Sequence, residues 1–308
     1  MLLRRSALIC PVLTPSHCGE PNCPSTRAHG DTRPRPSAVD SQDTTSLNGP
    51  SRSWRSWNCF AANIDQAKIQ AQVDALVKPR YYIATAGSTI GSVPLAVSEV
   101  TRGSARNESL LSLGWGTVGI DEGWEGNVTE KNASQRCGAG INGSVVHWPN
   151  GTPAIGSNFP DMAGLVNYAR GKGVKMGWYF NGCGCNEQIE KKVNYEGDVA
   201  AAVRLKFDSV KMDSCGSQRN MTLYGELFNR SGVPMAIENC HQGRNDGPDQ
   251  GNPGQMGPDW CPYTSFRTSG DILNMWDRVM SNLMSVVPFL GSATNRPLSR
   301  RSCWAYAE

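Results

Sequence analysis

Residues 161–181 read DMAGLVNYARGKGVKMGWYFN, and this stretch decides the fold. Its first half places apolar side chains at helical spacing behind Asp161, a residue type that caps helices, and Gly171 is positioned to end the helix. Its second half, residues 174–180, has the length and apolar content of a buried strand and is followed by the polar Asn181. A helix followed at once by such a strand is typical of a βα repeat.

The same alternation continues on both sides of this stretch. Helical spacing occurs over 64–77, 195–203 and 223–228, and short apolar strands occur over 116–121, 209–213 and 234–239. The strands end in polar residues, namely Asp121, Asn181, Asp213 and Glu238. This order predicts a parallel sheet in an α/β fold, and in a (β/α)8 TIM barrel the carboxyl ends of the strands form the catalytic face. A doubly wound sheet also uses this edge, but no Gly-x-Gly-x-x-Gly lies between a strand and a helix.

The composition disfavours several classes of partner. Of the 308 residues 39% are hydrophobic, which suits one large α/β domain or two ordinary ones. The 30 basic and 27 acidic residues nearly balance, so neither a nucleic acid nor an anionic membrane is expected as a partner. No run of about 18 apolar residues occurs, and a membrane-spanning helix is therefore not expected. The oligomeric state is left open.

Shifts in composition suggest the segment boundaries. Residues 1–52 are rich in Ser, Pro, Thr and Arg without a period, which is typical of a disordered leader or a processed segment. The apolar residues at 7–13 are too few, and too interrupted by Pro11, for a convincing signal peptide. The catalytic domain is expected over 53–308, with the Gly/Ser/Thr-rich segment 80–106 as an insertion.

Cysteines and glycosylation sequons point to an oxidising compartment. The chain has 11 cysteines, and Asn-X-Ser/Thr begins at Asn107, Asn127, Asn132, Asn142, Asn150, Asn220 and Asn229. These features predict a glycoprotein that is secreted or lysosomal/vacuolar. A Ser/Thr/Asn-rich loop that carries no glycan stays open as the alternative.

Two carboxylates at strand exits carry the functional hypothesis. Asp213 follows the strand 209–212, and Asp271 lies in the segment 267–272, RTSGDI. Alone, each is an ordinary strand-end or helix-capping acid, and Asp271 is placed to cap a helix over 272–283. Together they are what glycosidic cleavage needs, because one carboxylate attacks the sugar carbon and the other shuttles the proton.

The electrostatics of this pair can also be predicted. Lys211 lies two residues before Asp213, on the same side of the strand, so its charge is expected to favour the Asp213 carboxylate. The Asp213 anion is in turn expected to raise the pKa of Asp271.

Other chemistries lack support in the sequence. Cys183-Gly184-Cys185 has no second cysteine pair and no histidine cluster to complete a zinc site, and the four histidines are scattered. No Gly-x-Ser-x-Gly elbow supports a serine hydrolase. Neither a metal nor a cofactor is predicted.

Five segments in order resemble a known family. They are WRSWNCF (54–60), GIDEGW (119–124), NFPDM with YARGKGVKMG (158–177), KMDSC (211–215) and RTSGDI (267–272). Over roughly 53–306 the chain resembles glycoside hydrolase family 27, the melibiase-type α-galactosidases and their α-N-acetylgalactosaminidase relatives. The resemblance implies a TIM-barrel glycosidase that acts on α-galactosides.

The resemblance also implies roles for individual residues. Asp213 would be the nucleophile and Asp271 the general acid/base of a retaining mechanism. The implied substrate-binding residues are Trp57, Asp121, Glu122, Tyr179, Lys211, His241 and Arg267. Glu122 stands where the family has Asp, and the region of His241, which distinguishes a 2-hydroxyl from a 2-acetamido group, matches neither pattern. For Trp57, Trp124 and Tyr179, a place in the core is the alternative.

Disulfides near the site are implied in the same way. The family's bridges correspond to Cys185–Cys215, or Cys183–Cys215, and to Cys240–Cys261, although spacing alone does not fix connectivity.

The chain also departs from the family pattern. Phe266 replaces a Trp, and the sequence stops at CWAYAE (303–308), where the family's Trp-x-x-Pro-Asp-Met-Leu begins. The barrel is therefore expected to be incomplete at its C-terminal end, with two open sheet edges and without the family's C-terminal β-sandwich domain. The expected function is retaining hydrolysis of terminal α-D-galactosyl residues, and α-N-acetylgalactosaminidase or a noncatalytic galactose-binding relative are the alternatives.

Overall fold

The computed structural model describes residues 53–81, 89–90, 93–94, 107–125, 146–183, 191–240, 260–273, 275–290, 299 and 303–308. The helices are α1 (Trp57–Phe60), α2 (Gln66–Val77), α4 (Met162–Gly171), α5 (Lys192–Arg204), α6 (Met221–Ser231), α7 (Trp276–Met284) and the 3-10 helix η1 (Val287–Phe289). The strands are β1 (Ser53–Arg55), β2 (Arg80–Tyr81), β3 (Thr89–Ile90), β4 (Val93–Pro94), β5 (Asn107–Glu108), β6 (Thr117–Gly119), β7 (Lys175–Phe180), β8 (Ser209–Met212), β9 (Ala236–Asn239), β10 (Ser265–Arg267) and β11 (Trp304–Tyr306).

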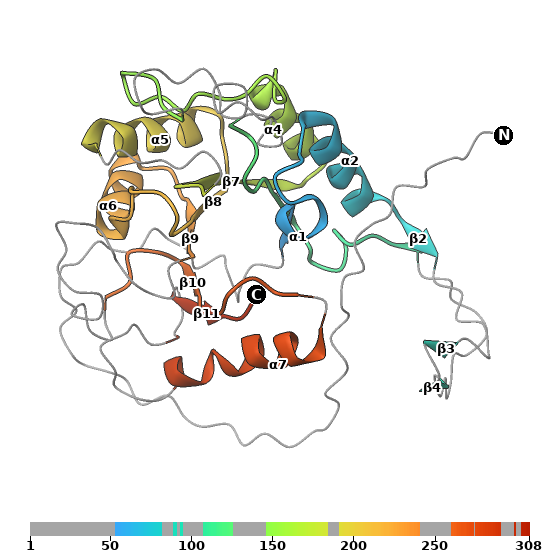
Figure 1. The fold of residues 1–308 in the computed structure, drawn as a ribbon. Coiled ribbons are helices and arrows are strands. Elements are labelled where there is room, and N and C mark those ends of the chain that lie inside the picture. The colour runs from blue at the N-terminus through green and yellow to red at the C-terminus, as the bar shows by residue number, and fades with distance from the viewer. Residues whose placement is uncertain are drawn as a thin grey trace, which may run out of the picture.

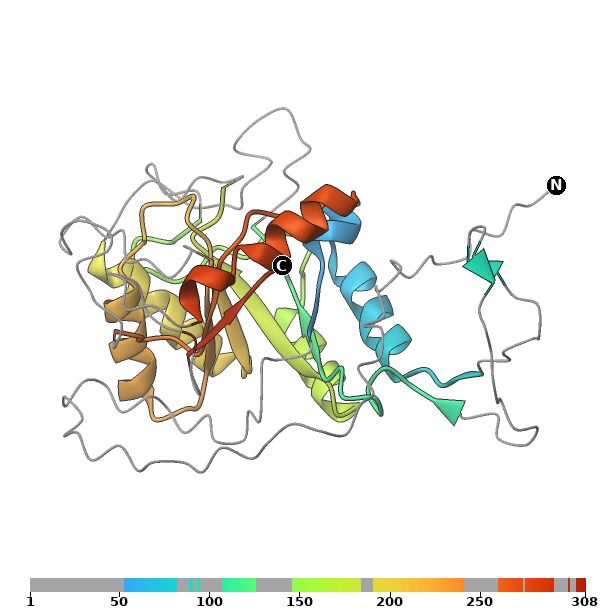
Figure 2. The same cartoon turned by 90° about the horizontal axis from the view of Figure 1, so that it is seen from below.

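Seven parallel strands form the main sheet, in the order β1-β6-β7-β8-β9-β10-β11. The helices α2, α4, α5 and α6 lie outside the curved sheet (Figure 1). This architecture confirms the prediction of an incomplete (β/α)8 barrel. Two further antiparallel pairs, β2–β5 and β3–β4, are separate from it, and the β3–β4 pair lies to one side in both views (Figures 1 and 2).

Contacts across the interior show that the sheet curls. β1 and β9 are four strands apart in the sheet order, which in a flat sheet corresponds to about 19 Å at about 4.8 Å per strand. Yet Arg55 Nη2 on β1 lies 2.8 Å from Glu238 Oε2 on β9. Trp57, after β1, likewise bonds to Asp271, after β10, at 3.2 Å. The two edges of the sheet therefore approach each other.

Local sequence explains where several elements begin and end. The Asp161 carboxylate accepts a hydrogen bond from Gly164 N–H at the start of α4, as the sequence predicts. The Asn220 side chain caps α6 in the same way, and Gly232 ends α6 in the left-handed conformation. The start predicted for the next helix is wrong. α7 begins at Trp276 with Met275 at its N-cap, because the Asp271 carboxylate is bound elsewhere.

The core lies between the sheet and the outer helices. On β7, Trp178 and Phe180 join Trp124 and Phe207 in a buried aromatic cluster, with the rings of Trp178 and Phe207 stacked 4.8 Å apart. Trp124 is thus a core residue, in agreement with the alternative placement. None of the helices in the described ranges is long and apolar enough to cross a lipid bilayer.

The inner face of the sheet is more polar. Register pairs Tyr179 on β7 with Lys211 on β8, and Lys211 with Glu238 on β9. A Cβ at Gly119 would come within 3.0 Å of the Arg55 guanidinium, so the glycine leaves room for this partly buried cation. The polar side chains at this face prepare the site at the carboxyl ends of the strands.

Candidate active site

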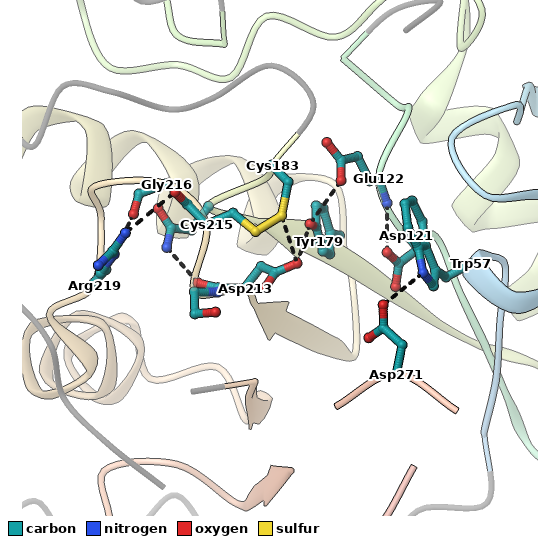
Figure 3. The surroundings of a disulfide bond; sticks show 12 residues. Trp57, Asp121, Glu122, Tyr179, Cys183, Asp213, Cys215, Gly216, Arg219 and Asp271 are labelled. Carbon is teal, nitrogen blue, oxygen red and sulfur yellow. Dashed lines mark hydrogen bonds between the residues drawn. A yellow bond between two sulfur atoms is a disulfide. The ribbon is translucent and has the colours of Figure 1, made fainter. Parts of the chain in front are cut away.

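The carboxyl ends of the parallel strands bring the predicted residues to one edge. Asp121 follows β6, Asp213 follows β8 and Asp271 follows β10, and Figure 3 shows them with Trp57 and Tyr179. Asp213 follows β8 and Asp271 follows β10, and one strand, β9, lies between these two. This arrangement corresponds to about 10 Å between the axes of β8 and β10. Two aspartates that lean toward each other across this span can place their carboxyl groups around one sugar ring.

Asp213 is held on several sides. Its backbone N–H donates to the Phe180 carbonyl at 3.0 Å, and its own carbonyl accepts from Asn181 Nδ2 at 2.5 Å. Its carboxylate accepts from Ser214 N–H at Oδ1 (2.6 Å) and from the Tyr179 hydroxyl at Oδ2 (2.5 Å). The orientation of this carboxylate is therefore fixed by the ends of both β7 and β8.

Asp271 has different surroundings, since its side chain is 48% exposed. Burial acts to raise the pKa of Asp271, but the hydrogen bond and charge of Arg267, the charge of Lys211 and the hydrogen bond of Trp57 outweigh it, so the pKa is lowered. Arg267 Nη1 donates to Asp271 Oδ1 at 2.5 Å. The expectation of a raised pKa is therefore wrong here, because it took account of the Asp213 anion and not of the adjacent cation.

Lys211 and Asp121 form a buried ion pair. Lys211 Nζ lies 2.9 Å from Asp121 Oδ2, and both side chains are almost fully buried. Burial acts to lower the pKa of Lys211, but the charge of Asp121 reverses the effect and the pKa is raised. Lys211, whose charge was expected to favour the Asp213 carboxylate, thus makes its hydrogen bond to Asp121 instead. The Asp121 backbone N–H is fixed by the Ser56 hydroxyl at 2.9 Å.

Glu122 is an acid of the site with a raised pKa. Burial, together with the charges of Asp213 and Asp121, raises the pKa of Glu122 from 4.5 to about 7. The hydroxyl of the buried Tyr179 lies between two acids, 3.4 Å from Glu122 Oε2 and 2.5 Å from Asp213 Oδ2. Tyr179 is thus both a buried ring and a contributor of one polar atom to the site.

Sequence reasoning missed several residues of this region. The Glu308 carboxylate forms an ion pair with Arg267, in addition to the pair between Arg267 and Asp271. Beneath the site, Glu238 accepts hydrogen bonds from Arg55 and from the Tyr306 hydroxyl. The sequence identifies Glu238 as an acid at the end of a strand. Its partners, Arg55 and Tyr306, lie on the two edge strands, and no local sequence pattern predicts that they meet Glu238.

The disulfides require a correction. The structure contains Cys183–Cys215, the second of the two alternatives, and Cys261–Cys303 in place of the predicted Cys240–Cys261. Cys261 and Cys303 precede the adjacent strands β10 and β11, whereas Cys240 follows β9 at the opposite end of the sheet, where it is a buried thiol. Burial raises the pKa of Cys240. Cys185 and His241 lie outside the described residues.

Comparison with known proteins finds several sequence relatives named as α-galactosidases. A protein of Dictyostelium discoideum named "Probable alpha-galactosidase" is 25% identical over 250 residues, which cover 78% of this chain and 50% of that protein. Alpha-galactosidase A of Cellvibrio japonicus is 25% identical over 235 residues, covering 74% of this chain and 45% of that protein. The chain thus spans about half the length of the curated relatives it matches. No family model matches the chain.

The chain is also similar to solved structures. A family 27 β-L-arabinopyranosidase from Geobacillus stearothermophilus superposes with a TM-score of 0.52 at 13% identity, over 80% of this chain and 58% of that one. Alpha-galactosidase I from Mortierella vinacea matches with a TM-score of 0.46 at 21% identity, over 73% of this chain and 46% of that one. The first of these likenesses supports a (β/α)8-type barrel.

Proposed function

We propose that this chain, a relative of the melibiase-type α-galactosidases of glycoside hydrolase family 27, is a retaining hydrolase of terminal α-D-galactosyl residues. The observation that carries the proposal is the placement of Asp213 and Asp271 at one edge of the sheet, with Arg267 and the Lys211–Asp121 pair beside them. This arrangement supplies two carboxylates for bond cleavage and several charged groups for sugar hydroxyls.

In the proposed reaction Asp213 attacks the anomeric carbon while Asp271 protonates the departing glycosidic oxygen. A covalent galactosyl–Asp213 ester results, and Asp271 then removes a proton from the water that hydrolyses it. The Tyr179 hydroxyl and Ser214 N–H hold the Asp213 carboxylate for this attack. Because the ester carries no charge, its formation removes an anion from the neighbourhood of Asp271 and Glu122.

The sugar would be held by groups around the two acids. Asp121, Lys211 and Arg267 offer charged acceptors and donors to hydroxyl groups, and Trp57 offers a half-buried indole ring for stacking. The indole N–H of Trp57 is bonded to Asp271, which fixes the ring beside the acid. The Glu122 side chain is one carbon longer than that of Asp, and its carboxylate accepts a hydrogen bond from the Tyr179 hydroxyl.

The direct test is hydrolysis of p-nitrophenyl α-galactoside by Asp213→Ala. We expect the rate to fall to background and azide to restore part of it, because the small anion replaces the missing nucleophile in the cavity. Asp277→Ala, an exposed acid in the first turn of α7, is the matched control and should behave as wild type. Wild-type activity of Asp213→Ala would exclude the proposal.

The competing functions are separated by substrate. Comparison of p-nitrophenyl α-galactoside with its 2-acetamido analogue distinguishes α-galactosidase from α-N-acetylgalactosaminidase activity. The β-L-arabinopyranoside belongs in the same series, since a protein of this fold carries that name. Galactose binding by calorimetry without turnover of any of these substrates, unchanged by Asp213→Asn, would instead indicate a noncatalytic sugar-binding protein.

A further inference from the structure

The Cys183–Cys215 disulfide lies directly beside the proposed nucleophile. Cys183 comes after β7, Cys215 is two residues after Asp213, and Cys183 Sγ lies 3.8 Å from Asp213 Oδ2 (Figure 3). One ligand atom from each of the three side chains lies within 4.8 Å of the other two. A thiolate pair and a carboxylate gathered in this way are a set of metal ligands once the bridge is open.

We propose that reduction of Cys183–Cys215 creates a site for a soft divalent cation, Zn²⁺ or Cd²⁺, whose ligands are the two thiolates and the Asp213 carboxylate. The bound cation occupies the nucleophile and stops hydrolysis. Inhibition of hydrolysis by the bound cation rests on the proposed function, whereas cation binding itself depends only on the three side chains.

The spacing suits a tetrahedral cation. Zinc binds thiolate sulfur at about 2.3 Å and carboxylate oxygen at about 2.0–2.2 Å, so tetrahedral ligand atoms lie roughly 3.5–3.8 Å apart. The 3.8 Å between Cys183 Sγ and Asp213 Oδ2 already matches this spacing. The two sulfurs are bonded to each other in the oxidised protein and must move apart to reach it once the S–S bond is open. Three protein ligands leave the fourth position for water, and the two sulfurs favour a soft cation over Mg²⁺ or Ca²⁺.

Hydrogen bonds hold the ligands in place without the bridge. The turn after β8 is fixed by Gly216 N–H to the Asn181 carbonyl at 3.0 Å and by Arg219 Nε–H to the Gly216 carbonyl at 2.6 Å (Figure 3). Cys183 lies two residues after the buried Asn181, whose side chain donates to the Asp213 carbonyl at 2.5 Å. Opening the S–S bond therefore leaves both cysteines near Asp213.

A reductant can reach the bridge because Cys183 is exposed. A dithiol reductant delivers two electrons and two protons, which break the S–S bond and give two thiols, while the dithiol is oxidised to its own disulfide. The cation then displaces the two thiol protons to solvent. The same loop that carries the proposed nucleophile thus carries the group that makes it sensitive to redox state.

The test begins with reduction of the protein by dithiothreitol, which is then removed under anaerobic conditions. The protein is titrated with Cd²⁺, and binding is monitored through the charge-transfer absorbance between thiolate and cadmium. Wild type and the matched control Cys261→Ser/Cys303→Ser, which lacks the bridge at the other end of the sheet, should show the same tight binding phase. Cys183→Ser/Cys215→Ser should lose this phase. Asp213→Asn should keep the band but bind about tenfold more weakly or worse, since one ligand is removed.

Several results would overturn the site: a tight phase that persists in Cys183→Ser/Cys215→Ser, equal affinity in Asp213→Asn, or equal binding by the oxidised protein. Loss of the folded circular dichroism spectrum in Cys183→Ser/Cys215→Ser would also overturn it, because the bridge would then be needed to hold the ligands. Zn²⁺ should inhibit the reduced enzyme and spare the oxidised one. Tight Cd²⁺ binding together with undiminished hydrolysis would leave the site standing and contradict Asp213 as nucleophile.

Discussion

Glu122 is an acid of the site with a pKa close to neutral pH. The residue is 3% exposed, and its pKa of about 7 reflects burial next to Asp213 and Asp121. Asp271, by contrast, has a lowered pKa because of Arg267. Glu122 therefore keeps its proton over much of the acidic range, and it stands at a position where the resemblance to family 27 implies Asp.

This pKa predicts how stability depends on pH. The folded protein binds a proton at Glu122 up to about pH 7, whereas the unfolded chain releases it near 4.5, so stability falls as the pH rises between these values. The total loss is about 3 kcal/mol. Glu122→Gln removes this titration, and urea unfolding at several pH values should show wild type losing stability relative to the variant across the window. Parallel curves for the two proteins would contradict the assignment.

Trp57 adds to the effect of Arg267 and Lys211 in lowering the pKa of Asp271, through its indole N–H. Trp57→Phe keeps an aromatic ring for the sugar and removes this donor, so the pKa of Asp271 should rise. A larger fraction of Asp271 is then protonated at a given pH. Galactosides with poor leaving groups require this general acid, so activity on them should extend to higher pH. Measured pH profiles of kcat/KM should show the alkaline limb shifted upward for raffinose and little changed for the p-nitrophenyl substrate. An unshifted limb on raffinose would show that the hydrogen bond has no such effect.

At the scale of elements, Asn181 ties the ends of β7 and β8 together. It is fully buried, has a φ of 61°, accepts from Gln218 N–H at 2.8 Å and donates to the Asp213 carbonyl at 2.5 Å. Gln218 also bonds to Asp198, which pairs with His147 at 2.7 Å. A buried polar network thus extends from α5 to the backbone of the proposed nucleophile.

Asn181→Gly tests this connection without backbone strain, since glycine adopts positive φ freely. We expect kcat to fall by about 10²-fold with a smaller change in KM, because Asp213 loses its fixed position. Asn220→Ala is the control: it removes the cap of α6, at about 1 kcal/mol of stability, and should leave kcat unchanged. Equal kcat values for Asn181→Gly and Asn220→Ala would mean that the network does not position the nucleophile.

The elements themselves were largely predictable, whereas their partners were not. Residues 161–181 predict α4 and β7 because periodicity and capping are local properties, and the strand-end rule places Asp121 and Asp213 at one edge. The disulfide of Cys261, the Lys211–Asp121 pair and the start of α7 depend on which strand ends meet in space. Residues distant in the sequence decide such contacts, and a single sequence carries no local signal for them.

At the scale of the whole molecule, the sheet has seven strands among the described residues, and β1 and β11 are its edges. A polar cluster of Arg55, Glu238 and Tyr306 connects both edge strands to β9. Burial acts to raise the pKa of Glu238, but Arg55 and Lys211 outweigh it and the pKa is lowered. This cluster therefore stabilises the curled form of the sheet around a charged interior.

Arg55→Met should destabilise the protein because Glu238 is left without its cation. We expect a loss of about 2 kcal/mol in urea unfolding at pH 7, since both side chains are mostly buried. Arg55→Met/Glu238→Leu should recover much of this loss. Arg170→Met, which breaks a more exposed pair with Asp208, should cost less than about 1 kcal/mol. A loss in Arg55→Met no greater than in Arg170→Met would argue against the interior cluster as the support of the curled sheet.

The most direct measurement is mass spectrometry of the protein after reaction with an activated, fluorinated α-galactoside that accumulates the covalent intermediate. One galactosyl group should be attached per chain, on the peptide that contains Asp213, and Asp271→Ala should still be labelled. Attachment to another residue, or the absence of any adduct in a protein that hydrolyses the unfluorinated substrate, would contradict the pairing of these two aspartates.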